Sequence, residues 1–321
     1  MEACTAFLLA AGFGSRLRPL TLARPKPLLP VGGVAMLDLA LAQLRRHGHE
    51  RVLVNAHHLW EQVAAWAERN DVALQVELPD ILGTGGGLQA ALDRLADTVV
   101  IFNGDILTDT DLTALAASCP PGGAAMALRE IDELGTITPV SVAPDGRILR
   151  IGEITASADA PPVRWGGPGV HFTGIHAMAR EAIARTPSGF CGIVRTTYTE
   201  LVPAGLVRGT RHRGTWADLG TPPAYLDANM AVLDGELTLS VDPWQGATRG
   251  AGGSLIGAGA RVEGTVEHCV IGAGAVVPAG ARLRDCVVWD GVAVPAVALE
   301  RAVVYDGGAV LSVERGAGST P

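Results

Sequence analysis

Lys26 is the only lysine among the 321 residues of this chain, whereas 24 of its 25 basic residues are arginine. A lysine ammonium is a compact charge on a flexible stem, and a guanidinium is a planar fork that suits a different space. Pro25 and Pro27 fix φ on both sides of Lys26, which reduces the entropy lost when the ammonium is held at one point. A lysine retained by accident in an arginine-biased chain is the alternative interpretation of this position alone.

The segment before Lys26 has the composition of an anion-binding loop. An apolar run over residues 6–11 predicts a buried parallel strand that passes directly into Gly12 and Gly14. Glycines let the backbone turn its N–H groups toward an anion, and a phosphate is the expected ligand. The P-loop and dinucleotide patterns do not fit, because Leu17 stands where the latter needs a third glycine. The basic residues that follow the loop are Arg16, Arg18 and Lys26.

Two aspartates are candidate ligands for a metal ion. Asp105 directly follows the apolar run 99–104, which predicts a carboxylate held at the tip of a buried strand. A helix cap is the alternative role, but Asp109 and Asp111 are better placed to cap the next helix. Asp218 lies in the sequence G-T-W-A-D-L-G-T-P, in which the final Thr-Pro is a helix start and leaves the aspartate unexplained.

These side chains must be positioned by alternating strands and helices. Predicted strands cover residues 6–11, 51–56, 73–78 and 98–103, and predicted helices cover 36–47, 60–69, 87–95 and 111–117. This alternation predicts a doubly wound, Rossmann-like α/β sheet, in which ligands bind beyond the carboxyl ends of the strands. We therefore expect a nucleotide at the glycine loop that follows the first strand.

Two further segments extend the predicted site. Residues 82–87 read L-G-T-G-G-G and predict a glycine-rich turn before a helix. A flexible connection is the structural alternative, whereas bare backbone at a helix start suits the close approach of a base or sugar. Residues 123–176 change to short β-like runs at 125–129, 136–142, 148–153 and 170–176, which predict a mixed sheet for an acceptor.

The pattern G-x-G-x-R-x-x-P-x-T followed by P-K-P resembles the signature of the sugar-1-phosphate nucleotidylyltransferases, also called NDP-sugar pyrophosphorylases. The resemblance implies a glycine loop around a nucleoside triphosphate, Arg16 and Lys26 on the reacting phosphates, and Asp105 and Asp218 on Mg²⁺. The implied nucleotide-binding residues are Leu9, Ala10, Ala11, Gly12, Gly14, Glu77, Gly83, Thr84, Gly85, Asn103 and Gly104. The implied sugar-binding residues are Gly135, Glu153, Thr173 and Gly174.

One departure from the family pattern concerns the sugar phosphate. Relatives that act on plain hexose phosphates often carry Glu-Lys-Pro where this chain has Glu153-Ile154-Thr155. The lysine that grips the sugar phosphate is therefore absent, and Arg164 or Arg195 is the expected substitute. The reaction implied by the resemblance is NTP plus sugar 1-phosphate giving NDP-sugar plus pyrophosphate.

A repeat occupies the C-terminal part of the chain. I-G-A-G-A occurs at residues 256–260 and again at 271–275, and aliphatic residues recur at mostly six-residue spacing. This pattern predicts a short left-handed β-helix of hexapeptide repeats. The predicted division is a nucleotidyltransferase domain over 1–235, a linker over 236–250 and the tail over 251–321. Because every charged motif precedes residue 235, we expect a catalytic domain that folds without the tail, and a tail that mediates homo-oligomerisation.

Two members of the family are candidates for the base and the sugar, and guanylyl transfer is narrowly favoured over uridylyl transfer. The tail favours guanylyl transfer to mannose 1-phosphate or a related sugar, and the three consecutive glycines favour uridylyl transfer to N-acetylmuramate 1-phosphate or another sugar phosphate. Two remote alternatives are a catalytically silent regulatory subunit and a hexapeptide acyltransferase. The presence of all four charged residues argues against a silent regulatory subunit; they are Arg16, Lys26, Asp105 and Asp218. A tail with His268 as its single histidine argues against an acyltransferase.

Composition narrows the partners and the compartment. A net charge of −8 and a pI near 5.5 argue against nucleic acid or an anionic membrane surface as a partner. No apolar run of about 18 residues is present, and the N-terminus lacks the pattern of an export signal. Five scattered cysteines predict thiols in a cytoplasmic protein, and the His57-His58 pair lacks the spacing of a metal site.

Overall fold

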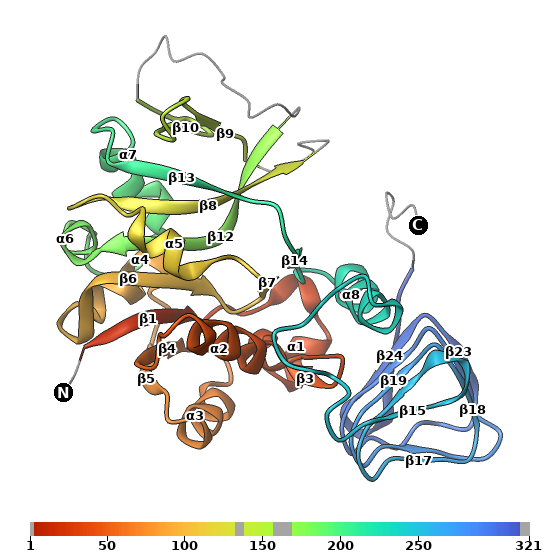
Figure 1. The fold of residues 1–321 in the computed structure, drawn as a ribbon. Coiled ribbons are helices and arrows are strands. Elements are labelled where there is room, and N and C mark those ends of the chain that lie inside the picture. The colour runs from red at the N-terminus through yellow and green to blue at the C-terminus, as the bar shows by residue number, and fades with distance from the viewer. Residues whose placement is uncertain (1–2, 132–137, 157–168, 315–321) are drawn as a thin grey trace. The chain divides into compact units, whose positions relative to one another are not determined.

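The computed structural model describes residues 3–131, 138–156 and 169–314, and it divides into two compact units (Figure 1). Unit 1 comprises Met1–Gly12 and Gln43–Trp216, and unit 2 comprises Phe13–Ala42 and Ala217–Pro321. This division does not follow the predicted boundary at residue 235. The segment that carries Arg16 and Lys26 groups with the tail.

Unit 1 is built on a seven-stranded sheet in the order β13-β8-β12-β6-β1-β4-β5. Its strands are β1 (Cys4–Leu9), β4 (Val52–Ala56), β5 (Ala73–Val76), β6 (Leu95–Asn103), β8 (Ala124–Ile131), β12 (Gly169–Ala179) and β13 (Val207–His212). Within this sheet β12 runs antiparallel to both neighbours, and the other strands are mutually parallel. The predicted Rossmann-like α/β fold is confirmed.

The described part of unit 1 contains short α-helices, of which α5 starts at a side-chain cap that the sequence predicts. They are α3 (Trp60–Arg69), α4 (Gly83–Ala90), α5 (Leu112–Ala117), α6 (Arg180–Ile183) and α7 (Thr197–Leu201), with the short turns η3 (Leu92–Arg94) and η4 (Ile193–Arg195). The Asp111 carboxylate caps α5 by accepting the Ala114 N–H at 2.9 Å, as predicted. The predicted loop over 82–87 is wrong, because α4 starts at Gly83 and the glycines form its first turns.

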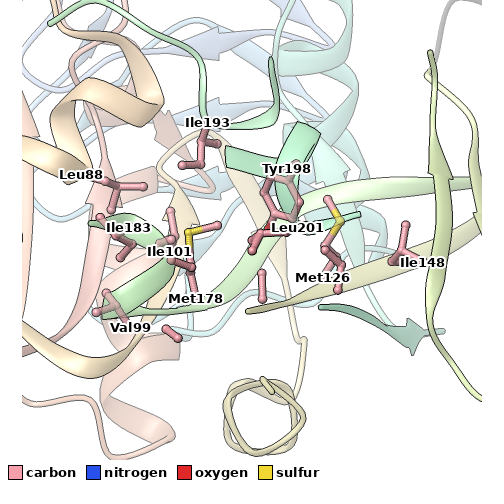
Figure 2. Close-up of a cluster of buried hydrophobic side chains, with 14 of the residues drawn as sticks. Leu88, Val99, Ile101, Met126, Ile148, Met178, Ile183, Ile193, Tyr198 and Leu201 are labelled. Carbon is pink, nitrogen blue, oxygen red and sulfur yellow. The ribbon is translucent and has the colours of Figure 1, made fainter. Parts of the chain in front are cut away.

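The main core of unit 1 lies on one face of β6, β8 and β12. Alternate residues of β6, Val99 and Ile101, point to the same face, as the two-residue period of a strand requires. Figure 2 shows that these side chains converge with others from α4, α6 and α7. The other labelled members of this cluster are Leu88, Met126, Ile148, Met178, Ile183, Ile193, Tyr198 and Leu201.

A smaller antiparallel sheet completes unit 1. It consists of β9 (Val140–Val142), β10 (Ile148–Ile151) and β11 (Ile154–Thr155) in the order β11-β10-β9. The short strand β7 (Ile106–Thr108) directly follows Asp105, the first candidate metal ligand. The short strand β14 (Trp216–Asp218) ends with Asp218, the second candidate. The predicted runs at 125–129, 148–153 and 170–176 correspond to β8, β10 and β12, and the described part of 136–142 contains β9.

Unit 2 combines the segment around Lys26 with a helix and the tail. The segment forms η1 (Ser15–Leu17), α1 (Leu20–Ala23), η2 (Lys26–Leu28), the hairpin β2 (Pro30–Val31) and β3 (Val34–Ala35), and the start of α2 (Met36–Arg46), which continues into unit 1. Helix α8 (Pro222–Asp234) starts at Thr221, whose hydroxyl accepts the Ala224 N–H at 3.4 Å, and ends at Gly235 with φ +77°. The start of the helix agrees with the prediction.

The tail is a parallel β-helix with three faces. One face is the sheet β15-β16-β19-β22-β24-β25, the second is β17-β20 and the third is β18-β21-β23. Successive coils stack Ile256 on Ile271, then Val288, then Val304. The strands are β15 (Thr248–Arg249), β16 (Leu255–Ile256), β17 (Arg261–Val262), β18 (Thr265–Glu267), β19 (Val270–Ile271), β20 (Val276–Val277), β21 (Arg282–Arg284), β22 (Val287–Val288), β23 (Ala298–Glu300), β24 (Ala302–Tyr305) and β25 (Ala309–Ser312), with the turns η5 (Ala251–Gly253) and η6 (Asp306–Gly308).

In the part of the chain that the structure describes, no helix is both long enough and apolar enough to cross a membrane.

Candidate functional site

The glycine loop folds tightly over the stem of Lys26. Gly14 has φ +60°, and a Cβ there would lie 2.8 Å from Thr21 Cγ2 and 3.0 Å from Lys26 Cβ. The Thr21 hydroxyl closes the turn by donating a hydrogen bond to the Gly14 carbonyl at 2.9 Å. Glycine is therefore required at this position by backbone conformation and by space. The loop in turn fixes where the buried Lys26 stem lies.

Unit 2 brings Arg16, Lys26 and Asp218 into one cluster. Lys26 Nζ lies 3.9 Å from Asp218 Oδ1, and the two side chains are 10% and 41% exposed. A Cβ at Gly220 would lie 2.8 Å from Arg16 Nη2, so the exposed guanidinium packs on the backbone just after Asp218. Two cations and a partly exposed carboxylate suit a polyanion that is accompanied by a hard cation.

We expect Gly220→Ala to lower kcat/KM by about tenfold with little change in melting temperature. The added methyl displaces the far end of a flexible side chain, which costs little stability, but that end is the Arg16 guanidinium that must meet the phosphates. Steady-state kinetics and thermal unfolding measure both effects. Gly235→Ala is a poor control because of its positive φ, whereas Ala217→Gly probes backbone loosening beside the same carboxylate. Wild-type kcat/KM in Gly220→Ala would show that Arg16 need not occupy this position.

The end of β1 is held by one side-chain and one backbone hydrogen bond from the segments on either side of it. The Ala10 N–H donates to Asn55 Oδ1 at 2.7 Å, and the Leu9 carbonyl accepts the Gly104 N–H at 3.0 Å. Chain neighbours apart, no described heavy atom lies within 4 Å of a Cβ placed at Gly12. Packing within the chain therefore gives no reason for glycine at this position, which leaves its backbone accessible to a ligand.

Glu77 is buried and its carboxylate is committed to the protein. Its Oε1 accepts Asn55 Nδ2–H at 2.7 Å and its Oε2 accepts the Leu82 N–H at 2.7 Å, while the residue is 2% exposed. Together with the Asn55–Ala10 bond, this network joins the start of α4 to the end of β1. Sequence reasoning missed Asn55. Its signal was a polar residue inside the apolar strand Val52–Ala56.

The second glycine-rich segment packs against residues 189–193 of the same unit. The Gly85 and Gly86 N–H groups, at the start of α4, both donate to the Cys191 carbonyl, at 2.9 and 3.4 Å. A Cβ at Gly83 would lie 2.6 Å from that oxygen, and one at Gly86 would collide with the Gly189 carbonyl oxygen. The glycines thus have a structural explanation within the chain. The Thr84 hydroxyl joins them by accepting the Ile193 N–H at 2.9 Å.

The candidate residues at the end of β6 also lie close to β12. Gly174 has φ +86°, and a Cβ there would lie 2.8 Å from Asn103 Nδ2. The Thr173 hydroxyl donates to the Ala127 carbonyl at 2.9 Å, and the Thr173 carbonyl accepts Trp216 Nε1–H at 2.9 Å. The hydroxyl and the carbonyl of Thr173 are therefore both hydrogen-bonded within the protein. Asp105 follows β6 and is partly exposed.

The predicted sugar-binding residues are only partly described. Glu153 is exposed in the turn between β10 and β11, and Arg195 is exposed at the end of η4. Gly135 and Arg164 lie outside the described residues. The two halves of the predicted site divide between the units: Asp105 and the sugar candidates belong to unit 1, and Arg16, Lys26 and Asp218 belong to unit 2.

Other titratable groups have structural partners. In residues 3–131, 138–156 and 169–314, no group of three His, Cys, Asp or Glu residues is placed to hold a metal ion by itself. His57 Nδ1 bonds to the Glu77 carbonyl at 2.8 Å. In the tail, His268 Nδ1 lies 2.6 Å from Asp285 Oδ1 and its Nε2 lies 3.1 Å from Asp234 Oδ1. Both ring nitrogens of His268 are thus engaged, which does not favour the acyltransferase alternative.

Comparisons with known proteins agree with this arrangement. The family described as "MobA-like NTP transferase domain" matches residues 6–185, more than half of the chain. A mannose-1-phosphate guanylyltransferase of Mycobacterium tuberculosis is 29% identical over 305 residues, covering 91% of this chain and 81% of that protein. An N-acetylmuramate alpha-1-phosphate uridylyltransferase of Neisseria meningitidis serogroup B is 32% identical over 232 residues, covering 67% of this chain and 93% of that protein. The crystal structure of HddC from Yersinia pseudotuberculosis shares the fold, with a TM-score of 0.58 at 18% identity over 71% of this chain and 99% of that chain.

Proposed function

The chain belongs to the MobA-like NTP transferase family and, within it, to the sugar-1-phosphate nucleotidylyltransferases, and on that premise we propose that it transfers a guanylyl group from GTP to mannose 1-phosphate or a related sugar 1-phosphate. The observation that carries this choice is the match to the mannose-1-phosphate guanylyltransferase over 91% of the chain. Residues after 250 make up more than a fifth of the chain, so that match must include much of the β-helix.

Uridylyl transfer to N-acetylmuramate 1-phosphate or another sugar phosphate is the alternative. Its support is the 32% identity to the uridylyltransferase and the three consecutive glycines. The glycines are weak evidence for uridylyl transfer, because close contacts inside unit 1 already explain Gly85, Gly86 and Gly87. A base-specific reason for them is not needed.

The reaction joins two anions. An oxygen of the sugar phosphate attacks the α-phosphorus of the nucleoside triphosphate, a P–O bond forms there, and the bond to the β-phosphate breaks to release pyrophosphate. The attacking phosphate is already anionic near neutral pH, so no general base is required. Arg16 and Lys26 lower the barrier by neutralising charge on the transferring and leaving phosphates, a contribution of about several kcal/mol in a site shielded from water.

The donor set in this chain fits Mg²⁺. Asp105 and Asp218 are partly exposed oxygen donors, and within the described residues no group of three His, Cys, Asp or Glu side chains includes either of them. Mg²⁺ prefers such sparse carboxylate ligation together with waters and phosphate oxygens. When bound, the ion neutralises charge on the phosphates. Asp105 and Asp218 would hold it, and the ammonium beside Asp218 would meet the same polyanion.

The tail supports a proposal on assembly and compartment. Among the described strands, β25 pairs on one side only and forms an edge of the six-stranded sheet, with Val310 exposed. Such an edge is a template for pairing with a second copy, so we place a homo-oligomer contact on this hexapeptide-repeat tail. The five cysteines are all thiols, which supports a cytoplasmic location.

Pyrophosphate release across five nucleoside triphosphates and a panel of sugar 1-phosphates tests the proposal. The expected result is the highest kcat/KM for GTP with mannose 1-phosphate or a sugar of related stereochemistry. A preference for UTP with N-acetylmuramate 1-phosphate would select the alternative. No pyrophosphate release from any pair, with folded protein and Mg²⁺ present, would overturn the proposed activity and favour a regulatory subunit.

We expect Lys26→Arg to lower turnover by at least about tenfold while the fold stays intact. The planar guanidinium cannot occupy the place of a compact ammonium whose stem is packed under Gly14 and which is only 8% exposed. The measurements are kcat and thermal unfolding. Arg18→Lys, the reverse exchange at an exposed position, serves as the matched control. Near wild-type turnover of Lys26→Arg would show that the single lysine is a compositional accident.

A further inference from the structure

Helix α8 holds the segment that carries Lys26 at two points. Tyr225 Oη donates to the Pro30 carbonyl at 2.7 Å, and Asn229 Oδ1 accepts the Gly32 N–H at 2.9 Å. Both side chains are fully buried. Burial raises the pKa of Tyr225, so its hydroxyl keeps the proton that it donates to Pro30. The two bonds fix the chain four and six residues after Lys26.

The β-helix reaches the same tyrosine and the other side of Lys26. Trp289 follows β22 in the tail, is 1% exposed, and donates its indole N–H to Tyr225 Oη at 3.2 Å. The Arg24 guanidinium carbon lies 4.4 Å from the centroid of the Trp289 ring, a cation–π contact. Trp289 therefore contacts Arg24, two residues before Lys26, directly. It is also connected to Pro30, four residues after Lys26, through the hydroxyl of Tyr225.

Two side-chain contacts join the tail to the same helix, one an arginine–aspartate ion pair and the other a histidine–aspartate contact. Arg301 Nη2 lies 2.7 Å from Asp227 Oδ1, and His268 Nε2 lies 3.1 Å from Asp234 Oδ1. These contacts lie at the middle of α8 and at its last residue. They tie two positions of the helix to the β-helix. All of these residues belong to unit 2.

We propose that the C-terminal β-helix is part of the phosphate-binding machinery, with Trp289 and Tyr225 as positioning residues for the segment that carries Arg16 and Lys26. The inference rests on the proposed function for what the two cations do. The tail would then act in catalysis as well as in assembly, because its contacts reach the chain both before Lys26, at Arg24, and after it, at Pro30. A small shift of a charge aimed at the reacting phosphates is enough to lower turnover.

Three single variants test the contacts one at a time. Arg24→Ala removes the cation–π contact, Tyr225→Phe removes the shared hydroxyl, and Trp289→Phe keeps an aromatic ring but loses the N–H donor. We expect Tyr225→Phe to lower kcat by about tenfold and the other two by about threefold to tenfold, with smaller changes in KM. Trp289→Phe should retain more activity than Trp289→Ala, because Arg24 keeps a ring to pack on.

The chain offers a matched control. Arg249 lies over the Trp244 ring at 4.2 Å, in unit 2 but outside the phosphate-binding segment and α8. Arg249→Ala and Trp244→Phe repeat two of these changes on a pair that lies outside residues 13–42 and outside α8. Wild-type kcat is expected for both control variants.

Chemical labelling provides a second measurement that does not depend on turnover. Because Lys26 is the only lysine, an amine-reactive ester labels one internal site, and mass spectrometry of the peptide containing it gives the labelling rate. Lys26 is 8% exposed. We expect its labelling to accelerate by about threefold or more in Tyr225→Phe and Trp289→Ala, well below their melting temperatures, and to stay unchanged in the controls.

Variants that only lower the melting temperature, with kcat and Lys26 labelling equal to those of the controls, would overturn the inference. If the wild-type chain transfers no nucleotidyl group, the proposed function fails, and the labelling rates still decide whether the tail positions Lys26. If labelling of Lys26 becomes faster but kcat does not fall, the tail positions Lys26 but this position does not determine turnover. That result would show that the tail is not part of the phosphate-binding machinery.

Discussion

Asp105→Asn and Asp218→Asn are each expected to lower Mg²⁺-dependent turnover by about three orders of magnitude. An asparagine keeps the shape of the side chain but removes the charge that would hold a hard cation among phosphates. We expect only a small loss of stability, because the Asp218 side chain is 41% exposed and its Oδ1 lies 3.9 Å from Lys26 Nζ, at the long end of ion-pair distances. Turnover as a function of Mg²⁺ concentration, with thermal unfolding in parallel, measures both quantities.

Two other aspartates provide the controls for this experiment. Asp111 caps α5 in unit 1, and Asp242 accepts the Trp244 N–H in unit 2. Asparagine caps as well as aspartate, so Asp111→Asn and Asp242→Asn should keep both activity and stability. If either Asp105→Asn or Asp218→Asn retained about a tenth of wild-type turnover at the Mg²⁺ concentration that saturates the wild type, the two-carboxylate site would be wrong. Chelation of divalent cations should abolish the wild-type reaction in the same assay.

The alternation of strands and helices was predictable because it depends on the spacing of apolar residues within short stretches of the chain. The runs around β1, β4, β5 and β6 are short, apolar and bounded by polar segments, and α3 buries Val63, Trp66 and Ala67 at helical spacing. The caps of α5 and α8 likewise follow from single residues, Asp111 and Thr221. In each case the signal and the structure that it predicts lie within a few residues of one another.

The second glycine segment shows where local reasoning stops. Its glycines suggest a loop, but they form the first turns of α4 because the carbonyl of Cys191, more than 100 residues later, accepts their N–H groups. The same limit applies to Asn55 and Glu77, which are 22 residues apart and meet only because β4 and β5 are neighbours. Neither side chain belongs to the motif that reveals the family. Both lie where a change would move the backbone of that motif.

The grouping of the tail with the Lys26 segment is also a long-range property. The hydrogen bond between Tyr225 and Pro30 spans 195 residues, and the one between Trp289 and Tyr225 spans 64. Periodicity correctly predicts the coils of the β-helix, since each coil stacks on the next along the chain. It carries no information on what the outer surface of a coil contacts. The sequence therefore predicted a separate tail, whereas the structure joins the tail to α8.

Removal of residues 250–321 is accordingly expected to lower kcat by at least about a hundredfold, or to leave a chain that does not fold. The truncation takes away the indole N–H that bonds to Tyr225, the ring that packs on Arg24, and the contacts of Arg301 and His268 with α8. Tyr225, fully buried in the intact chain, would then be exposed on the side that the tail covers. Circular dichroism, light scattering and kcat on the truncated chain measure folding, assembly and turnover.

A chain lacking only residues 315–321 is the control for this truncation, since those residues follow the last coil, and it should match the wild type. The sequence alone predicts the opposite outcome for the long truncation, a folded catalytic domain with altered assembly. The two expectations differ most in one case. If the long truncation is folded and monodisperse and retains wild-type kcat, the tail serves association alone, and the bonds from Trp289 and Tyr225 do not determine where Lys26 acts. If it is folded but slow, with Lys26 labelled faster than in the intact chain, the β-helix acts on catalysis through the segment that it holds.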